Sequence, residues 1–247
     1  MIYNEDCLIG LKRIPDKSID ACITDPPYSL NKDYGNDSDK LSKADYLAFM
    51  YEWIDEVDRV LKDNGSFYIF LSWQYSPEIF SYIKTKMNMV NEIIWDRRVP
   101  SMGGSTRSYS SVHDNIGFFV KGKGYTFNID DIRIPYDEET KKKRSRKRFE
   151  GAKWLELGCN PKDVWSISRI HGQSQERQPH PTQKPLELIN RLVLASSNEN
   201  DTILDPFLGS GTTAISCINL KRNIIGFELN PIYYTQVLKR IQDNSNG

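Results

Sequence analysis

A glycine-rich turn between a short apolar strand and a helix is the feature that most constrains how this 247-residue chain folds. Residues 201–205 have the length and apolar content of a buried strand, and a helix is predicted at residues 211–220. The segment Leu208-Gly209-Ser210-Gly211 joins them. Glycines let a backbone approach a ligand closely, and the first turn of a helix offers free N–H groups. The segment is neither the G-x-G-x-x-G dinucleotide motif nor a P-loop, because no Gly-Lys-Ser/Thr sequence follows it.

An acidic residue at the end of the next predicted strand indicates the kind of ligand. Glu228 lies about 20 residues beyond the glycine-rich turn, where an acid binds ribose hydroxyls in Rossmann-type sites. The ligand therefore carries a ribose but needs no phosphate. S-adenosylmethionine fits this description, and the turn and the acid together are much more specific than either alone.

Strand-like and helix-like segments alternate along most of the chain. Buried strands are predicted at residues 18–24, 66–71, 90–95, 115–120, 201–205 and 223–228. Helices are predicted at residues 41–63, 77–86, 184–197, 211–220 and 231–243, and Asn64-Gly65 is expected to close the first of them. The alternation predicts one α/β domain whose mixed, mostly parallel sheet is built from both ends of the chain and covered on both faces.

The motif Asp25-Pro26-Pro27-Tyr28 ends the first predicted strand, and reacting groups in such sheets gather at the carboxyl ends of strands. An aromatic amine is a poor nucleophile because its lone pair is delocalised into the ring, and two hydrogen-bond acceptors facing it localise that lone pair. The Asp25 carboxylate and the Pro26 carbonyl can be these acceptors, and Tyr28 offers a face for stacking a base. Taken alone, the motif also suits an ordinary strand-to-loop turn.

Positive charge is concentrated in the middle of a chain whose net charge is zero. Residues 95–184 hold 18 basic and 11 acidic side chains, and residues 141–148 include seven cations. A segregated basic region is typical of a surface that meets phosphates. On its own, the run at 141–148 is equally well explained as a solvated charge cluster.

Several classes of protein are disfavoured by what the sequence lacks. The four cysteines are far apart and the three histidines show no metal-ligand spacing, so we predict reduced thiols and no metal site. No apolar run approaches the roughly 20 residues of a membrane span, and no signal peptide is recognisable. We therefore expect a cytoplasmic protein.

The two motifs together resemble those of the DNA amino-methyltransferases. Their order, with Asp25-Pro26-Pro27-Tyr28 before the 205–213 sequence DPFLGSGTT, resembles the beta group of that family, in which the fold is circularly permuted. Residues 4–8 and 180–185 resemble two donor-binding segments of the family, and 95–104 resembles small adenine-specific members from restriction–modification systems. Glu5 departs from the glycine that often stands at its position, which leaves only the local turn in question.

This resemblance implies a Rossmann-like, S-adenosylmethionine-dependent methyltransferase fold, circularly permuted, with one antiparallel edge hairpin in a mixed sheet. Residues 1–125 and 163–247 would form the catalytic and donor-binding domain, and residues 126–162 a target-recognition insertion. A target adenine would be flipped out of duplex DNA and methylated at N6. The implied catalytic residues are Asp25, Pro26, Pro27 and Tyr28. The implied donor-binding residues are Asp6, Cys7, Asp25, Thr182, Lys184, Asp205, Phe207, Gly209, Ser210, Gly211, Thr212 and Glu228. The implied DNA-binding residues are Arg97, Arg107, Lys141, Lys142, Lys143, Arg144, Arg146, Lys147 and Arg148.

Three other functions remain to be weighed. Cytosine-N4 methylation uses the same amine chemistry, but family members of that type more often carry Ser in place of Asp25. Glutamine methylation on proteins uses a similar site with Asn at that position and with the donor motif first, which is the reverse of the order here. A DNA-binding protein with an inactive site is disfavoured because both motifs are intact. The partners we expect are double-stranded DNA, a cognate restriction endonuclease and a second copy of the chain.

Overall fold

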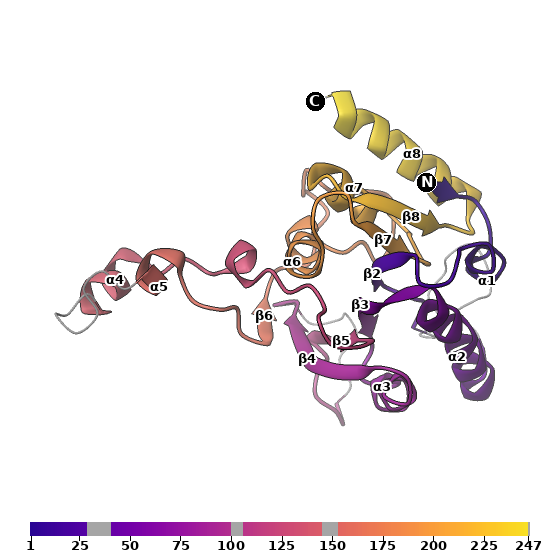
Figure 1. Ribbon diagram of the computed structural model, residues 1–247, viewed down its shortest axis with the longest axis horizontal. Helices are drawn as coiled ribbons and strands as arrows, with labels where there is room; N and C mark the ends of the chain where they lie inside the picture. Colours follow the sequence, from indigo (N-terminus) through magenta and orange to yellow (C-terminus); the bar gives the residue numbers. More distant parts are fainter. Residues whose placement is uncertain (29–40, 100–105, 145–152, 247) are drawn as a thin grey trace.

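One mixed sheet of eight strands organises the part of the chain that the structure describes, in the order β1-β8-β7-β2-β3-β5-β4-β6 (Figure 1). The structure is a computed structural model that describes residues 1–28, 41–99, 106–144 and 153–246. The strands are β1 (Ile2–Tyr3), β2 (Ile19–Thr24), β3 (Leu61–Leu71), β4 (Asn88–Asp96), β5 (His113–Val120), β6 (Val164–Ser166), β7 (Thr202–Asp205) and β8 (Asn223–Phe227). The helices are α1 (Cys7–Leu11), α2 (Lys43–Val60), α3 (Ser76–Ile83), η2 (Ile129–Ile132, a 3₁₀ turn), α4 (Glu138–Arg144), α5 (Lys153–Leu157), α6 (Leu186–Ser196), α7 (Thr212–Asn219) and α8 (Pro231–Asn246).

Helices cover both faces of the sheet, as the sequence predicts. In Figure 1, α1, α2 and α3 lie on one side of the sheet and α6, α7 and α8 on the other. The central strand β3 shows why: Phe67 and Ile69 are buried against the first group, while Tyr68 and Phe70 are buried with the second. Successive side chains of a strand point to opposite faces, so a strand covered on both sides is apolar throughout. No helix in the described residues is long and apolar enough to cross a membrane.

The sheet joins the two ends of the chain at its centre. β7, from the last quarter of the sequence, pairs in parallel with β2, from the first, and each then leads outward through a helix to the next strand on its own side. The order of the strands therefore reverses between β7 and β2. Ligands of such sheets bind beyond the carboxyl ends of the strands at this switch point. The predicted circularly permuted, Rossmann-like fold is confirmed.

The first predicted helix is shorter than the sequence suggests. α2 begins with the Ser42 hydroxyl accepting the Asp45 N–H, but it ends at Val60, and Leu61 is already extended. Residues 61–65, including the Asn64-Gly65 pair expected to close the helix, belong to β3. The last helical carbonyl is satisfied by a distant segment, because the Ser18 N–H donates to Val60 at 2.9 Å. Tertiary pairing thus replaces the local helix cap that we predicted.

The predicted antiparallel hairpin is present, although one strand covers its outer side. β5 runs antiparallel to both β3 and β4, and β6 then pairs in parallel with β4. The hairpin is therefore one strand away from the edge. Sequence patterns miss β6 because it has only three residues, and β1 with two residues escapes them for the same reason.

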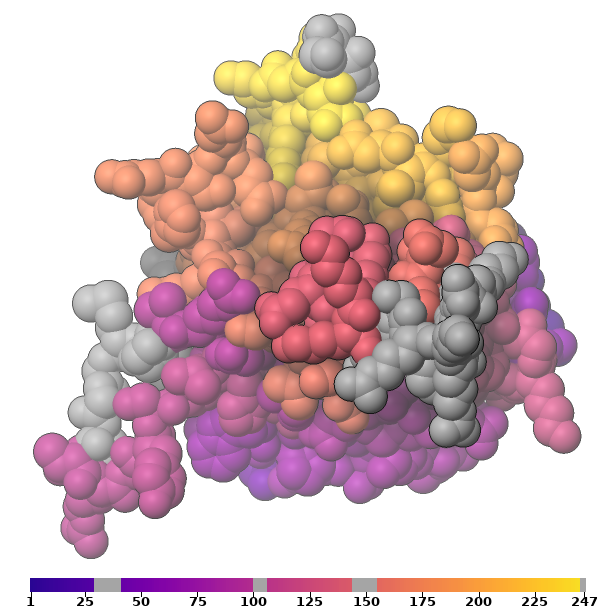
Figure 2. Space-filling model, turned by 90° about the vertical axis from the view of Figure 1, so that its left-hand side faces the viewer, coloured from indigo at the N-terminus to yellow at the C-terminus, as the bar shows by residue number. Residues whose placement is uncertain are grey.

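An arm extends from the sheet between β5 and β6, within the predicted insertion 126–162. Its first residues pack on the body, since the Asn128 side chain donates to the carbonyls of Leu194 and Ser197 at the end of α6. From about residue 133 the chain leaves the body, and an isolated bridge between Ile134 and Cys159 marks the base of the arm. In Figure 1, α4 and α5 lie far from the sheet, and in Figure 2 the arm stands in front of the body.

Candidate active site

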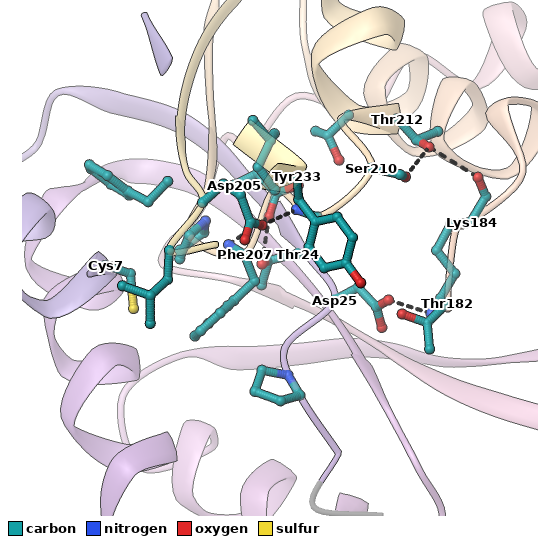
Figure 3. A pocket seen from close by; sticks show the side chains of 18 of the residues that line it. Cys7, Thr24, Asp25, Thr182, Lys184, Asp205, Phe207, Ser210, Thr212 and Tyr233 are labelled. Atoms are coloured by element: carbon teal, nitrogen blue, oxygen red, sulfur yellow. Dashed lines mark hydrogen bonds and ion pairs between the residues drawn. The ribbon is translucent and has the colours of Figure 1, made fainter. Parts of the chain in front are cut away.

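One pocket lies at the switch point and brings together most of the predicted catalytic and donor-binding residues (Figure 3). It is lined at one end by the glycine-rich turn after β7 and at the other by the segment after β2. The predicted residues that line it are Asp6, Cys7, Asp25, Pro27, Thr182, Lys184, Asp205, Phe207, Gly209, Ser210, Thr212 and Glu228. Two motifs about 180 positions apart thus form the two halves of a single site. The sequence predicts this, because the carboxyl ends of parallel strands meet at one edge of a sheet.

The glycine-rich turn has a backbone that other residues adopt only with strain. Gly209 and Gly211 have φ values of 52° and 76°, and Gly211 caps the start of α7. A Cβ atom at Gly211 would lie 2.9 Å from a methyl group of Val237 on α8. The two glycines therefore let the turn fold tightly beneath the pocket, with α7 beginning directly beside it.

Glu228 closes the donor end of the pocket. Its two carboxylate oxygens accept the N–H groups of Gly209 and Asn230, each at 2.8 Å. Burial raises the pKa of Glu228 to about 7, although these two N–H groups oppose the shift. A carboxylate held in this way retains lone pairs that can accept hydroxyl groups from a ribose.

Asp205 is more deeply buried and holds the turn together. Its Oδ1 accepts the Thr24 hydroxyl at 2.8 Å and the Phe207 N–H at 3.1 Å. Burial raises the pKa of this carboxyl group to about 6, against the effect of hydrogen bonds from Thr213 and Thr24. Asp205 was predicted to bind the donor; it also lines the pocket, and its contacts fix the turn on which the other donor-side residues depend.

Apolar side chains form the walls between Glu228 and the first helix. Phe207 meets Phe49 of α2 edge-on, with ring centroids 6.0 Å apart, and Leu229 continues the same wall. Asp6 caps α1 by accepting the Leu8 N–H at 2.7 Å, and the Cys7 thiol, whose pKa is raised by burial, is packed next to it. These surfaces suit the flat, apolar faces of an adenine ring.

The 180–184 segment forms the opposite side of the pocket. His180 is buried, and its ring lies 4.6 Å from that of Tyr233. Burial lowers the pKa of His180 to about 4, so the imidazole is neutral at pH 7, and its Nδ1 accepts the Thr182 N–H at 3.4 Å. The Lys184 carbonyl accepts the Thr212 hydroxyl at 3.2 Å, which ties this segment to the glycine-rich turn (Figure 3).

Asp25 and Tyr28 form the second half of the site, next to the donor pocket. The Tyr28 hydroxyl donates to Asp25 Oδ1 at 2.7 Å, and the Lys184 ammonium forms an ion pair with Asp25 Oδ2. The motif is fastened to α2, because the Tyr46 hydroxyl donates to the Pro27 carbonyl at 2.9 Å. These contacts hold the Asp25 carboxylate at the carboxyl end of β2, where it can accept a hydrogen bond from an amine.

Comparison with known proteins identifies this arrangement. A family model described as DNA methylase, covering N6 and N4 methyltransferases, matches residues 19–239. The chain belongs to the N6/N4 DNA methylase family. The methylase is 42% identical over 240 residues to the type II methyltransferase M.HpaI of Haemophilus parainfluenzae, covering 96% of this chain and 73% of that protein. It is 35% identical over 246 residues to the DNA adenine methyltransferase YhdJ of Escherichia coli K12, covering 97% and 82%.

Solved structures agree with this assignment. The M1.HpyAVI complex with S-adenosylmethionine superposes with a TM-score of 0.65 at 27% identity, covering 97% of this chain and 98% of that one. The cytosine-N4-specific PvuII methyltransferase has a TM-score of 0.73 at 19% identity, covering 99% and 90%, and shows the shared fold. The methylase uses S-adenosylmethionine as its methyl donor. The buried Glu228 carboxylate, the apolar walls and the tight glycine turn fit that molecule, which carries ribose hydroxyls and an adenine ring.

The predicted DNA-binding residues that the structure describes lie on separate parts of the chain. Arg97 follows β4, and its guanidinium is largely buried against the Ser111 carbonyl and the Asp114 carboxylate. Arg97 thus makes structural contacts within the methylase, and its contact with DNA stays a prediction. Arg107 is exposed in the loop before β5.

The basic run lies on the arm, away from the sheet. Lys141 and Lys143 on α4 form ion pairs with Glu138 and Glu139, one turn earlier on the same helix. Lys142 is exposed on that helix, and Arg144 is its last residue. Arg146, Lys147 and Arg148 lie outside the described residues.

Sequence reasoning missed several aromatic residues of the methylase pocket. Phe49 lies on α2 and Phe70 at the end of β3, where both read as ordinary core positions. Tyr233 on the first turn of α8 carries no local signal of a site. Only Phe70 among these three could have been predicted from the sequence, because it lies near the carboxyl end of a strand adjacent to β2.

Proposed function

We propose that this methylase transfers the methyl group to the N6 amine of adenine in duplex DNA. The observation that carries the proposal is the Asp25 carboxylate, held at the end of β2 beside the donor pocket by Tyr28 and Lys184. An acidic residue at this position favours adenine, because cytosine-N4 enzymes of the family more often carry Ser there. The similarity to YhdJ, which is named an adenine methyltransferase, supports the same base.

The role of each catalytic residue follows from the chemistry of the amine. Asp25 would accept one hydrogen of the target amine and the Pro26 carbonyl the other, which localises the nitrogen lone pair. Tyr28 would stack on the flipped base, a contact worth roughly 1–3 kcal/mol. The donor supplies a methyl group activated by its sulfonium charge. Catalysis then depends mainly on holding the amine in line with that methyl group.

The donor-side roles are assigned from the same pocket. Glu228 would accept the ribose hydroxyls, and Phe207, Cys7 and Asp6 would enclose the adenine. Thr182 and the helix-start residues Ser210 and Thr212 would face the methionine end. Asp205 and the two glycines, Gly209 and Gly211, would maintain the turn that presents these groups.

DNA would be bound by the arm and the exposed segment around Arg107. Lys141, Lys142 and Lys143 would contact phosphates, and the rest of the arm would read the target sequence. Similarity to type II methyltransferases such as M.HpaI supports a place in a restriction–modification system, with a cognate endonuclease acting on the same sequence. We also propose a homodimer, which light scattering would refute by giving a mass near the 28.6 kDa of one chain.

The deciding experiment identifies the methylated base. The protein is incubated with labelled S-adenosylmethionine and mixed-sequence duplex DNA, and the DNA is then digested to nucleosides for mass analysis. N6-methyladenine is the expected product. N4-methylcytosine would overturn the assignment of the base while leaving the amine chemistry intact, and no product on any DNA would overturn both.

A further inference from the structure

The side chain of Lys184 is directed toward the catalytic half of the pocket. Its ammonium contacts Asp25 Oδ2 and lies 5.4 Å from the ring centroids of Tyr28 and Phe70 and 5.8 Å from that of Trp95. Only 8% of the residue is exposed. Its backbone carbonyl, by contrast, accepts the Thr212 hydroxyl on the donor side. One residue therefore connects the donor turn to the catalytic carboxylate (Figure 3).

The environment of Asp25 explains what a cation contributes there. Burial raises the pKa of Asp25, and Lys184 is the strongest influence in the opposite direction. The Tyr28 hydroxyl also favours the ionised carboxylate, while Asp114 on β5 disfavours it. Asp114 has its own partner in Arg97.

The remaining charged and titratable groups around Asp25 do not replace Lys184. Asp205, at the end of β7, is a second buried carboxyl group, and the charge of Asp25 contributes to raising its pKa. His180 is neutral at pH 7, because burial lowers its pKa to about 4. Of the groups on the described elements around Asp25, Lys184 is the cation in direct contact with its carboxylate.

We propose that Lys184 is a positioning residue that keeps the Asp25 carboxylate ionised and correctly oriented for the target amine, and that donor binding is not its main role. A protonated carboxyl group would have one oxygen occupied by hydrogen and would accept the amine poorly. The three aromatic rings stabilise the ammonium where few water molecules reach it. This inference rests on the amine-acceptor role proposed for Asp25.

The pH dependence of the chemical step follows from this role. Without the ammonium, Asp25 would become protonated at a higher pH, since an opposite charge at this distance typically lowers a carboxyl pKa by about 1–3 units. The acidic limb of the rate profile should therefore move to higher pH. Removal of a purely structural interaction would lower the rate equally at every pH.

The test compares Lys184→Met, Lys184→Arg and the matched control Lys221→Met, an exposed lysine paired with Glu199. Single-turnover methylation rates are measured with saturating donor and DNA between pH 5.5 and 9, and donor affinity is measured by calorimetry. We expect Lys184→Met to shift the acidic limb upward by about one unit or more, with a donor dissociation constant within about threefold of the wild type. Lys184→Arg should restore most of the original profile, and Lys221→Met should leave it unchanged.

Two results would overturn the proposal. An unshifted profile in Lys184→Met would show that the ammonium does not control Asp25. If weakened donor binding were the main defect of Lys184→Met, the result would show that Lys184 acts mainly in binding the donor. Both outcomes are distinct from failure of the proposed function, because the identity of the methylated base is read from the nucleoside product and not from the pH profile.

Discussion

The hydroxyl group of Thr24 donates a hydrogen bond of 2.8 Å to the carboxylate of Asp205, 181 positions away. Thr24 is the last residue of β2 and Asp205 the last residue of β7, so the bond joins the strand before the proposed catalytic motif to the strand before the glycine-rich turn. Asp25 follows Thr24 directly, and the glycine-rich turn follows Asp205. This buried contact in the lining of the pocket therefore helps to fix the relative position of the two halves of the site.

Asp205 should make the folded protein less stable at neutral pH than an uncharged side chain would. Its folded pKa of about 6 lies above the ordinary value of 3.8, so folding favours the protonated form. The loss of stability caused by ionising buried Asp205 is absent below about pH 4. It develops between pH 4 and 6 and is complete above pH 6. We expect Asp205→Asn to raise the free energy of unfolding at pH 8 by up to about 3 kcal/mol, with the gain shrinking as the pH falls toward 4.

Urea denaturation of Asp205→Asn at pH 5 and pH 8 checks this expectation, with Asp243→Asn as a control at an exposed position. A difference from the wild type that is the same at both pH values would contradict it. Donor affinity should fall in the same variant, because the turn loses its charged anchor. Such a variant would be a case of stability gained at the expense of function.

Replacing Asp25 should separate catalysis from donor binding. Asp25→Ala removes one of the two acceptors facing the amine, and we expect the single-turnover rate to fall by about 10²–10⁴-fold. Glu228 and the walls of the donor pocket are untouched, so the donor dissociation constant should change by less than about threefold. Asp16→Ala, at an exposed carboxylate paired with Arg59, is the matched control. Full activity in Asp25→Ala would rule out the amine-polarising role.

Donor affinity should depend on the ionisation of Glu228. Its pKa of about 7 means that the carboxylate loses its charge as the pH falls through 7, and the protonated form accepts ribose hydroxyls less well. We expect the donor dissociation constant to rise below pH 7. Glu228→Gln should bind the donor about tenfold or more weakly at pH 8 and lose this pH dependence. Calorimetry from pH 6 to pH 8.5 tests both points, with Glu199→Gln as the control; a pH dependence that persists in Glu228→Gln would assign it to another group.

The lysines of α4 should contribute to DNA affinity and not to chemistry. Their ion pairs with Glu138 and Glu139 are exposed and therefore weak, so the lysines can exchange these partners for phosphates at little cost. Replacing Lys141, Lys142 and Lys143 with Gln should weaken DNA binding and reduce the slope of log affinity against log salt by about 0.9 for each phosphate that is no longer neutralised.

The control for that experiment replaces three exposed lysines of the body, Lys17, Lys43 and Lys221, each of which is also paired with an acid. This control variant removes the same number of positive charges from the surface of the body. Binding is measured by fluorescence anisotropy at several salt concentrations. Equal loss of affinity in the two triple variants would show that only net charge matters and that the arm makes no specific contribution.

The sequence predicts most of the sheet and both halves of the pocket, because these depend on local patterns. Apolar runs such as residues 66–71 identify the buried strands, and the rule that parallel strands end at one edge brings Asp25 close to the glycine-rich turn. The side chains that reach this edge from other elements are harder to predict. Phe49 lies on a helix whose periodicity accounts for it as a core residue.

Where prediction fails, a distant contact overrides a local signal. Asn64-Gly65 has the composition of a helix cap, yet the Lys121 N–H donates to the Gly65 carbonyl at 3.0 Å and the pair belongs to a strand. Sequence patterns also leave the direction of a side chain open: Lys184 was predicted to bind the donor, and the structure adds a contact with Asp25, 159 positions away. Arg97, predicted to contact DNA, forms an ion pair with Asp114 that no local pattern indicates.

The way in which the arm is attached bears on how enzymes of this kind can diversify. Ile134 and Cys159, at the two ends of the arm, pair in an antiparallel bridge and are its two anchor points. β6 then returns the chain to the sheet beside β4. An exchange of the residues between these two anchor points would alter neither the strand order nor the Thr24–Asp205 contact. If the arm reads the target sequence, as proposed above, recombination between related genes at this segment would give an enzyme a new target sequence in one step and leave its chemistry unchanged.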